Sequence, residues 1–214
     1  MVPSIEDCHA LMDKYEMLDN IKAHSVMVEK VAAIIGKGLK EAGESISLDV
    51  VRAGALMHDI AKTTCLKTGE DHAAMGRRLC IENQFDEIAE IVGQHVLLKA
   101  YNPGDGISES QIVYYADKRV NHDTIVSLEE RLRDLLIRYG KNKSLVRSRI
   151  RQNFRLAGEV EKQIFSHLKF RPGDVRRLVL SDEKVGKGCE KQISEGNAAV
   201  HQSGMLISGW AQER

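Results

Sequence analysis

The stretch LDVVRAGALMHDIAKTT, residues 48–64, decides the fold of this chain. From Leu48 to Ala61 it is apolar on nearly all sides, which is typical of a helix buried in the middle of a bundle. Ser47 precedes this helix as a capping-type residue. His58 and Asp59 lie inside the apolar run, where an ionisable group is costly unless it is paired or bound. The stretch therefore predicts a central buried helix that carries a functional pair.

Helical periodicity extends on both sides of this stretch, whereas strictly alternating, strand-like segments are hard to find. The sequence therefore predicts an all-α helical bundle with a C-terminal helical flank. Besides residues 48–61, helices are expected at about residues 4–18, 19–41, 71–83, 85–98, 110–120, 127–139 and 143–168. Loops are expected at residues 63–69 and 101–110, where Thr, Gly, Pro and Ser gather.

The length of 214 residues suits one domain plus an appendage. We expect a helical core at residues 1–125 and amphipathic helices packed on it at residues 126–171. Residues 172–214 mix glycines and charges without a sustained apolar face, and we expect an extension or a flexible tail there.

Charge and composition limit the classes of function. Lys plus Arg and Asp plus Glu both total 31, so no global field favours long nucleic acid or an anionic membrane, and the substrate is expected to be small. No apolar run approaches the roughly 18–20 residues of a membrane span, and the N-terminus lacks the pattern of a secretory signal. The four cysteines form no CxxC pair, which favours a reducing cytoplasm.

Four ionisable residues are predicted to share one metal ion in the bundle interior. His24 is spaced one turn from Ile21 and Val28 on an apolar helix face, and Asp117 lies on another inward face. Together with the 58–59 pair they come from three separate helices, which is how helical bundles build metal sites. Such nitrogen and oxygen ligands suit Mn, Fe, Mg, Ni or Zn without distinguishing among them.

Two more histidines predict a second ion. His72 opens the helix after the central loop, and His95 follows Ile91 by one turn. If both turn inward, Asp59 bridges two divalent ions, an arrangement able to activate water and neutralise phosphate oxygens. The alternatives are a solvent-facing His72 and a His95 that interacts with the dipole of its helix.

A lysine of the central stretch is a candidate phosphate ligand. Lys62 stands three residues after Asp59 at the end of the expected helix, as either a catalytic and substrate-binding lysine or a helix-terminal one. Lys99, one turn after His95, is a further candidate for substrate binding. Lys118 and Arg119, beside Asp117, could add to the same lining, and the alternative for Lys99, Lys118 and Arg119 is that all three are solvated.

The order His24, then His58-Asp59 within LMHDIAK, then Asp117 within YYADK resembles the HD superfamily of metal-dependent phosphohydrolases. MHDIAK is similar to the HDIGK branch, with Ala61 in place of the usual glycine, and the likeness covers roughly residues 20–125. It implies a five-helix metal-binding core and hydrolysis of phosphate esters, commonly of nucleotides. It also matches His72 and His95 to the residues that supply a second metal in binuclear members.

Departures from the sequence motifs of the superfamily narrow the range of expected substrates. Lys62 and Thr63 replace the Glu-Asp pair of alarmone hydrolases, and the GYP element of cyclic dinucleotide phosphodiesterases is missing. The sequence predicts a cytoplasmic enzyme that cleaves a phosphate ester or phosphoanhydride of a nucleotide or another small phosphorylated substrate with metal-activated water. Its alternatives are an HD-type di-iron oxygenase and a catalytically silent regulatory module that binds metal or ligand.

The remaining basic and histidine residues are assigned to the scaffold. The Arg-rich residues 133–155 invite a nucleic-acid interpretation, but their helical apolar positions favour a packed flank or a homodimer contact. The four other histidines lack suitable companions and are interpreted as ordinary surface or core residues; they are His9, His122, His167 and His201.

Overall fold

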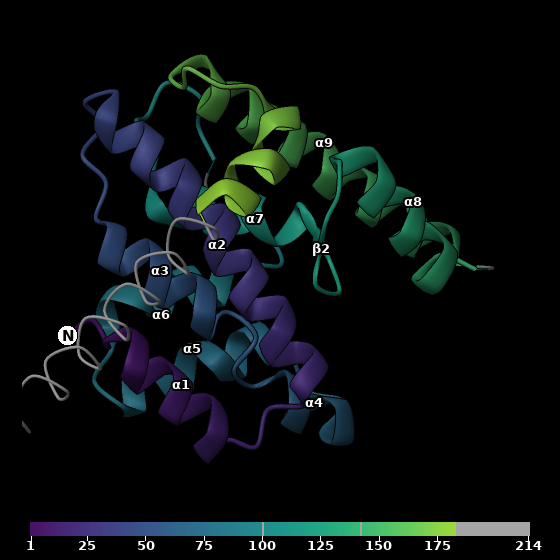
Figure 1. The fold of residues 1–214 in the computed structure, drawn as a ribbon. Coiled ribbons are helices and arrows are strands. Elements are labelled where there is room, and N and C mark those ends of the chain that lie inside the picture. The colour runs from purple at the N-terminus through teal and green to yellow at the C-terminus, as the bar shows by residue number, and fades with distance from the viewer. Residues whose placement is uncertain (100, 142, 183–214) are drawn as a thin grey trace, which may run out of the picture. The chain divides into compact units, whose positions relative to one another are not determined.

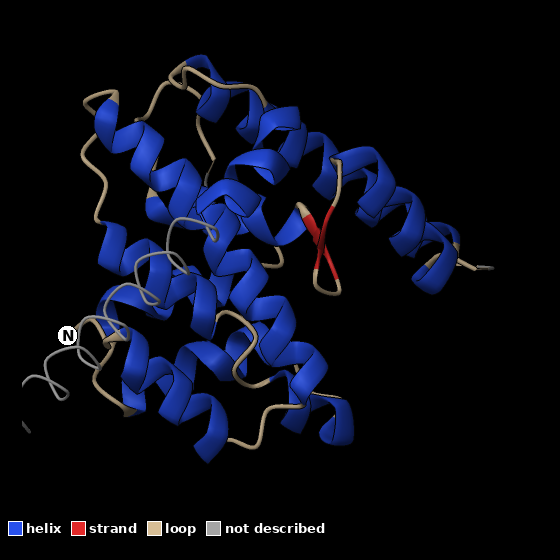
Figure 2. Cartoon of the chain, viewed as in Figure 1, coloured by secondary structure: helices blue, strands red, loops and turns tan. Residues whose placement is uncertain are grey.

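The computed structural model describes residues 1–99, 101–141 and 143–182, and the chain divides into two compact units, Met1–Arg176 and Arg177–Arg214. Nearly all regular structure of the first unit is helical (Figure 2), which confirms the predicted all-α fold. The helices are α1 (Ile5–Lys14), α2 (Asp19–Glu41), α3 (Leu48–Met57), α4 (Lys62–Thr68), α5 (His72–Glu82), α6 (Asp86–Gln94), α7 (Glu109–Lys118), α8 (Leu128–Tyr139) and α9 (Ser144–Ser166). A hairpin of β1 (Val120–Asn121) and β2 (Thr124–Ile125) links α7 to α8, and a 3-10 turn at Pro172–Asp174 follows α9.

Side-chain caps begin several of these helices. Ser4, Ser108 and Ser127 each accept a bond from the third backbone N–H of α1, α7 and α8, and the side-chain oxygen at that third position accepts a bond from the backbone N–H of the cap residue. Ser47 caps α3 and Asp71 caps α5. These bonds satisfy N–H groups that have no partner inside the helix, so they fix where each helix starts.

Helix α3 lies at the centre of the bundle (Figure 1), where it packs against α1, α2, α6 and α7. Its side chains Ala53, Leu56 and Met57 are buried in the main core cluster. Gly54 permits close approach of α6, because a Cβ at this position would lie 2.8 Å from the side chain of Ile91. The nearly uniform apolar character of α3 is thus explained by neighbours on several sides.

Helices α8 and α9 pack against each other, and α9 also packs on α7. The buried residues of α9 lie from its middle onward and are Phe154, Ala157, Val160 and Ile164. Helix α8 has no buried residue. The part of α9 from Phe154 onward therefore attaches this pair to the bundle.

Two expected boundaries in the central stretch are wrong. The predicted helix 48–61 ends at Met57, and the predicted loop at 63–69 is instead helix α4, which ends at Gly69 with φ 76°. Residues 58–61 form a turn in which the N–H of Ile60 donates to Met57 O and the N–H of Lys62 donates to Asp59 O. These i→i−3 bonds are tighter than α-helical ones, so the chain changes direction at the His-Asp pair.

Three other expected boundaries are also displaced. Helix α1 ends at Lys14 rather than residue 18, because the chain turns through Glu16 at φ 50°. Helix α6 ends at Gln94 rather than residue 98, with His95 as its C-cap. Part of the expected tail is ordered, since residues 175–182 are helical, and the rest, 183–214 with Cys189 and His201, lies outside the described residues.

Candidate metal centre

The turn after α3 places His58 and Asp59 in the interior, where their exposed fractions are 0% and 1%. His58 is the C-cap of α3, and its Nδ1 lies 2.7 Å from Ala55 O. His95 repeats this arrangement at the end of α6, with Nδ1 2.6 Å from Val92 O. In both cases the imidazole hydrogen-bonds to the carbonyl oxygen three residues earlier. This oxygen is an acceptor at the helix end that has no backbone N–H partner in the helix.

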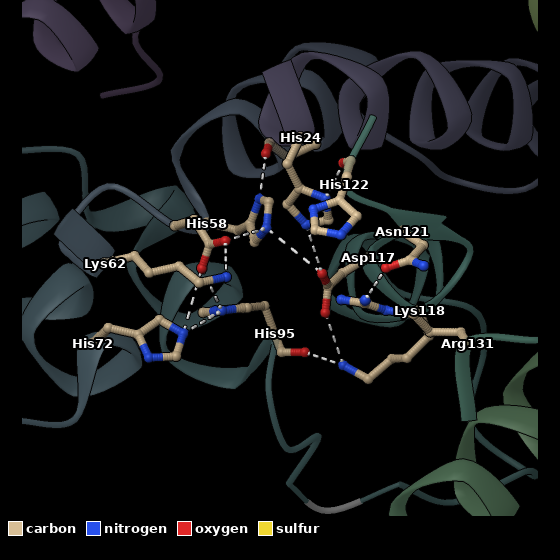
Figure 3. Close-up of polar contacts among 12 residues, drawn as sticks. His24, His58, Lys62, His72, His95, Asp117, Lys118, Asn121, His122 and Arg131 are labelled. Carbon is tan, nitrogen blue, oxygen red and sulfur yellow. Dashed lines mark hydrogen bonds and ion pairs between the residues drawn. The ribbon is translucent and has the colours of Figure 1, made fainter. Parts of the chain in front are cut away.

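A first group of side chains converges from α2, the α3–α4 turn and α7 (Figure 3). His24 Nε2 lies 3.0 Å from Asp117 Oδ1. His58 Nε2 lies 3.7 Å from the same oxygen and 3.4 Å from Asp59 Oδ2. Candidate ligand atoms of His24, His58 and Asp59 all lie within 4.8 Å of one another. The structure thus brings together all four residues that the sequence assigns to the first ion.

A second group shares Asp59 with the first. Asp59 Oδ1 lies 3.3 Å from His72 Nε2 and 3.4 Å from His95 Nε2, and the two imidazole nitrogens are 3.2 Å apart. Candidate ligand atoms of these three residues also lie within 4.8 Å of one another. Asp59 therefore lies between the two groups, with one oxygen toward each.

Main-chain carbonyls orient three of the four imidazoles. The Nδ1 atoms of His58 and His95 face Ala55 O and Val92 O, and Nδ1 of His24 lies 2.8 Å from His122 O. A carbonyl only accepts, so each Nδ1 carries the proton, and in the neutral ring Nε2 presents a lone pair. These lone pairs point at carboxylate oxygens, which are also acceptors, and a cation between them resolves the mismatch.

Two buried atoms of the cluster confirm that the ligand set fits a cation. Among the described residues, His58 Nε2 and Asp59 Oδ1 are buried without a hydrogen-bond partner. An unpartnered buried acceptor is costly, and both atoms are ligand types that divalent metals accept. The C-termini of α3 and α6 end at this cluster and add negative dipole ends, which also favour a positive ion.

The cluster holds its carboxyl groups ionised. Burial alone would raise the pKa of Asp59, but the neighbouring His58 holds that pKa well below its usual range. Burial would likewise raise the pKa of Asp117, but Lys118 holds it well below the usual range. Two anionic carboxylates therefore persist in a site that excludes most water, which is the electrostatic condition for binding a cation.

The pKa values of the buried basic side chains shift in different directions. Burial works against protonation of His58, but Asp59 and Asp117 raise its pKa above the ordinary value. Burial lowers the pKa of His95 and of Lys118. Burial thus favours the neutral form of His95, whereas the two carboxylates favour a positive charge beside them at His58.

Of the two lysines predicted to bind phosphate, Lys62 lies at the metal-ligand cluster and Lys99 does not. Lys62 begins α4 instead of ending α3, yet its Nζ lies 2.6 Å from Asp59 Oδ2 and its side chain is 37% exposed. It therefore lies at the edge of the cluster with access to solvent. Lys99 is exposed and lines a different cavity, against α9.

The expectation that Lys118 and Arg119 are solvated is wrong, because both side chains are nearly fully buried. Lys118 donates to His95 O and to Asp117 Oδ2 at 3.2 Å, and its ammonium lies 4.0 Å from the Tyr114 ring centre. Arg119 donates to Val126 O at 2.6 Å. Each lysine or arginine also has one carbonyl partner that is distant in sequence, His95 O for Lys118 and Pro172 O for Arg119, so the local polar pattern could not indicate burial.

Sequence reasoning also missed the role of the hairpin. His122, interpreted as an ordinary residue, has an exposed side chain, and it is its carbonyl that contacts His24. The residue adopts φ 55° in the two-residue turn between β1 and β2, which directs this carbonyl inward. The turn signal in VNHDTI, between β-branched residues, could have indicated the hairpin.

Comparisons with known proteins agree with this geometry. Residues 21–122 match the family model described as the HD domain. An uncharacterised protein of Methanocaldococcus jannaschii is 26% identical over 137 residues, covering 58% of this chain and 80% of the relative. No solved structure matches the chain. No helix within the described ranges is long and apolar enough to cross a membrane.

Proposed function

Because residues 21–122 form an HD domain, a family whose members are generally metal-dependent hydrolases, we propose that this protein is a metal-dependent phosphohydrolase. Its substrate is a nucleotide or another small compound with a phosphate ester or phosphoanhydride bond. One observation carries the proposal: two carboxylates and four imidazoles gather in the interior, with His58 Nε2 and Asp59 Oδ1 unpartnered among the described residues.

The proposed ligands fall into two sets. His24, His58, Asp59 and Asp117 hold one divalent ion, and Asp59, His72 and His95 hold a second. If only the first set is occupied, the protein binds one ion. If both sets are occupied, it binds two ions and Asp59 is a ligand of both. Divalent ions in such a centre supply Lewis acidity and an activated water for attack on phosphorus.

The lysines of the site take separate roles in this proposal. Lys62 has a partly exposed ammonium at the edge of the cluster, so it can bind a phosphoryl oxygen as substrate arrives and stabilise the charge that develops there. Lys118 is buried and holds Asp117 and the His95 carbonyl in place, so we assign it a positioning role.

The position of Lys62 favours phosphate chemistry over the alternative of a di-iron oxygenase. A cation aimed at the rim of the centre has a clear purpose when the substrate is an anion, and oxygen activation offers no comparable use for it. A cytoplasmic location and a homodimer contact through α8 and α9 are further parts of the proposal.

The decisive experiment combines metal content with turnover. Protein purified without chelators is analysed for elements, and phosphatase and phosphodiesterase panels are run with manganese, magnesium and nickel. We expect at least one divalent ion per chain and hydrolysis of a nucleotide. Asp59→Ala should lose the ion and reduce turnover by about 1,000-fold, as when a principal charge-stabilising group is removed.

Matched variants make this experiment specific. Asp86→Ala removes an exposed carboxylate at the start of α6 and should change neither metal content nor rate. Lys62→Met should slow hydrolysis while leaving the metal content intact, which also covers the case of an unstable Asp59 variant. Undiminished hydrolysis by a folded Asp59→Ala protein would reject the proposal, and iron with oxygen consumption would establish the oxygenase instead.

A further inference from the structure

A second concave site lies apart from the metal centre, between residues 97–99 and α9. The cavity measures about 880 Å³, within the range of small-molecule sites, and shares no lining residue with the metal-ligand cluster. Lys99, Arg149 and Arg155 contribute three positive charges to its lining, and Glu159 contributes one negative charge. The cavity therefore has a positive excess in a chain whose formal net charge is zero.

The arginines of this cavity differ in their ion pairs from those of the adjacent helix. On α8, Arg131 and Arg138 both pair with Asp134, and Arg133 pairs with Glu129. On α9, by contrast, neither Arg149 nor Arg155 has a hydrogen-bond or ion-pair partner among the described residues.

This difference follows from the sequence, because residues 141–155 contain six Lys and Arg and no acidic residue. Arg149 therefore has no acidic residue within four positions along the chain, and Arg155 has Glu159 alone at that spacing. Two guanidinium groups at one cavity, whose donors have no partner within the part of the chain that the structure describes, are suited to bind phosphate oxygens.

Apolar and amide groups complete the lining. Leu97, Leu98 and Leu156 form an apolar wall, and Leu97 remains 57% exposed. The amide of Asn153 is held by the protein, because its Nδ2 donates to Val96 O at 2.9 Å and its Oδ1 accepts from Tyr114. Gln152 has no such partner among the described residues, so its amide is free to hydrogen-bond a heteroaromatic ring.

We propose that this cavity binds a nucleoside polyphosphate, with Arg149, Arg155 and Lys99 on the phosphates. The leucine wall receives the base and Gln152 bonds to its edge. A bare polyphosphate would leave the apolar wall unused, and an uncharged nucleoside would leave the guanidinium groups unsatisfied. This site is separate from the metal centre, and the proposal does not rest on the hydrolase function.

The test measures binding by isothermal titration calorimetry on the full chain in EDTA. The probes are ATP and inorganic tripolyphosphate, and the Asp59→Ala chain is titrated in parallel. We expect ATP to bind both chains equally and more tightly than tripolyphosphate. Arg149→Ala/Arg155→Ala should weaken ATP binding about tenfold or more, because each arginine contributes charge-assisted bonds.

Two controls separate this site from diffuse attraction. Arg147→Ala/Arg151→Ala removes the same charge from the same helix outside this cavity and should change the Kd for ATP by less than about twofold. Leu97→Ser should weaken ATP binding and leave tripolyphosphate binding unchanged.

The proposal is overturned if both double variants lose affinity equally, or if ATP and tripolyphosphate bind alike. Loss of binding in Asp59→Ala alone would also overturn it, since the metal centre would then be the only nucleotide site.

Discussion

At the centre of the bundle, His58 and Asp59 are almost completely buried, whereas on α8 no residue is buried. The centre hides ionisable groups, and the α8–α9 pair exposes apolar ones such as Leu145, which is 76% exposed. Buried charges must find partners inside the protein, while exposed arginines remain available to a ligand. We therefore expect that packing around α3 contributes most to the stability of the fold, and that α9 carries the side chains available to bind a ligand.

The two regions should differ most in how much the free energy of unfolding falls when a leucine is truncated to alanine. Leu56→Ala removes a fully buried side chain from α3, so we expect the free energy of unfolding to fall by about 2–5 kcal/mol. Leu145→Ala on α9 should change it by less than about 0.5 kcal/mol. Urea denaturation measures both values, and similar losses would break the comparison.

Metal binding should stabilise the bundle through its centre. At a free divalent ion concentration 100 times the Kd, the free energy of unfolding should rise by about 2.7 kcal/mol. Chelation should reverse the gain, and Asp59→Ala should abolish it. Thermal unfolding with and without manganese measures the effect, and an equal gain in the Asp59 variant would place the ion elsewhere.

Two Gly→Ala substitutions should change the free energy of unfolding in opposite directions. Gly54→Ala introduces a Cβ 2.8 Å from Ile91, so overpacking should lower the free energy of unfolding by about 1–3 kcal/mol. Gly158→Ala on α9 meets nothing within 4 Å and should raise it by about 0.5–1 kcal/mol through helix propensity. Stabilisation by both variants would show that α3 and α6 can separate without cost.

Loss of a helix cap should give a small effect, comparable to that of Gly158→Ala. Ser127→Ala removes the capping box of α8, so we expect a loss of about 1 kcal/mol in the free energy of unfolding. Ser144→Ala is the matched control, because α9 begins without a side-chain cap. Denaturant titration compares the two, and an equally small change in both would mean that α8 unfolds independently of the bundle.

The ligand cluster could be predicted because its residues violate the local pattern. His24, His58 and Asp117 are ionisable groups at positions where helical spacing demands apolar ones, and this conflict is visible in the sequence. Their convergence is then a matter of helix packing, and the structure brings them to within hydrogen-bonding or near-contact distance.

The turn at His58 could not be predicted because nothing in the local sequence interrupts the helix. Residues 48–61 contain neither proline nor a glycine near the break. The helix ends where an imidazole takes the Ala55 carbonyl and the chain must reach α4, which are tertiary requirements. Burial of Lys118 likewise depends on Asp117, Tyr114 and the His95 carbonyl, and the carbonyl becomes a neighbour only in the folded chain.

The bonds from three imidazole Nδ1 atoms to main-chain carbonyls have a consequence for how an ion is exchanged. Rings fixed by the backbone have already lost their rotational freedom when the chain folds, so ion capture does not have to order them. An arriving ion would therefore meet side chains that are already in place. We expect one divalent ion to replace another without unfolding of the bundle, at a rate governed by access to the centre.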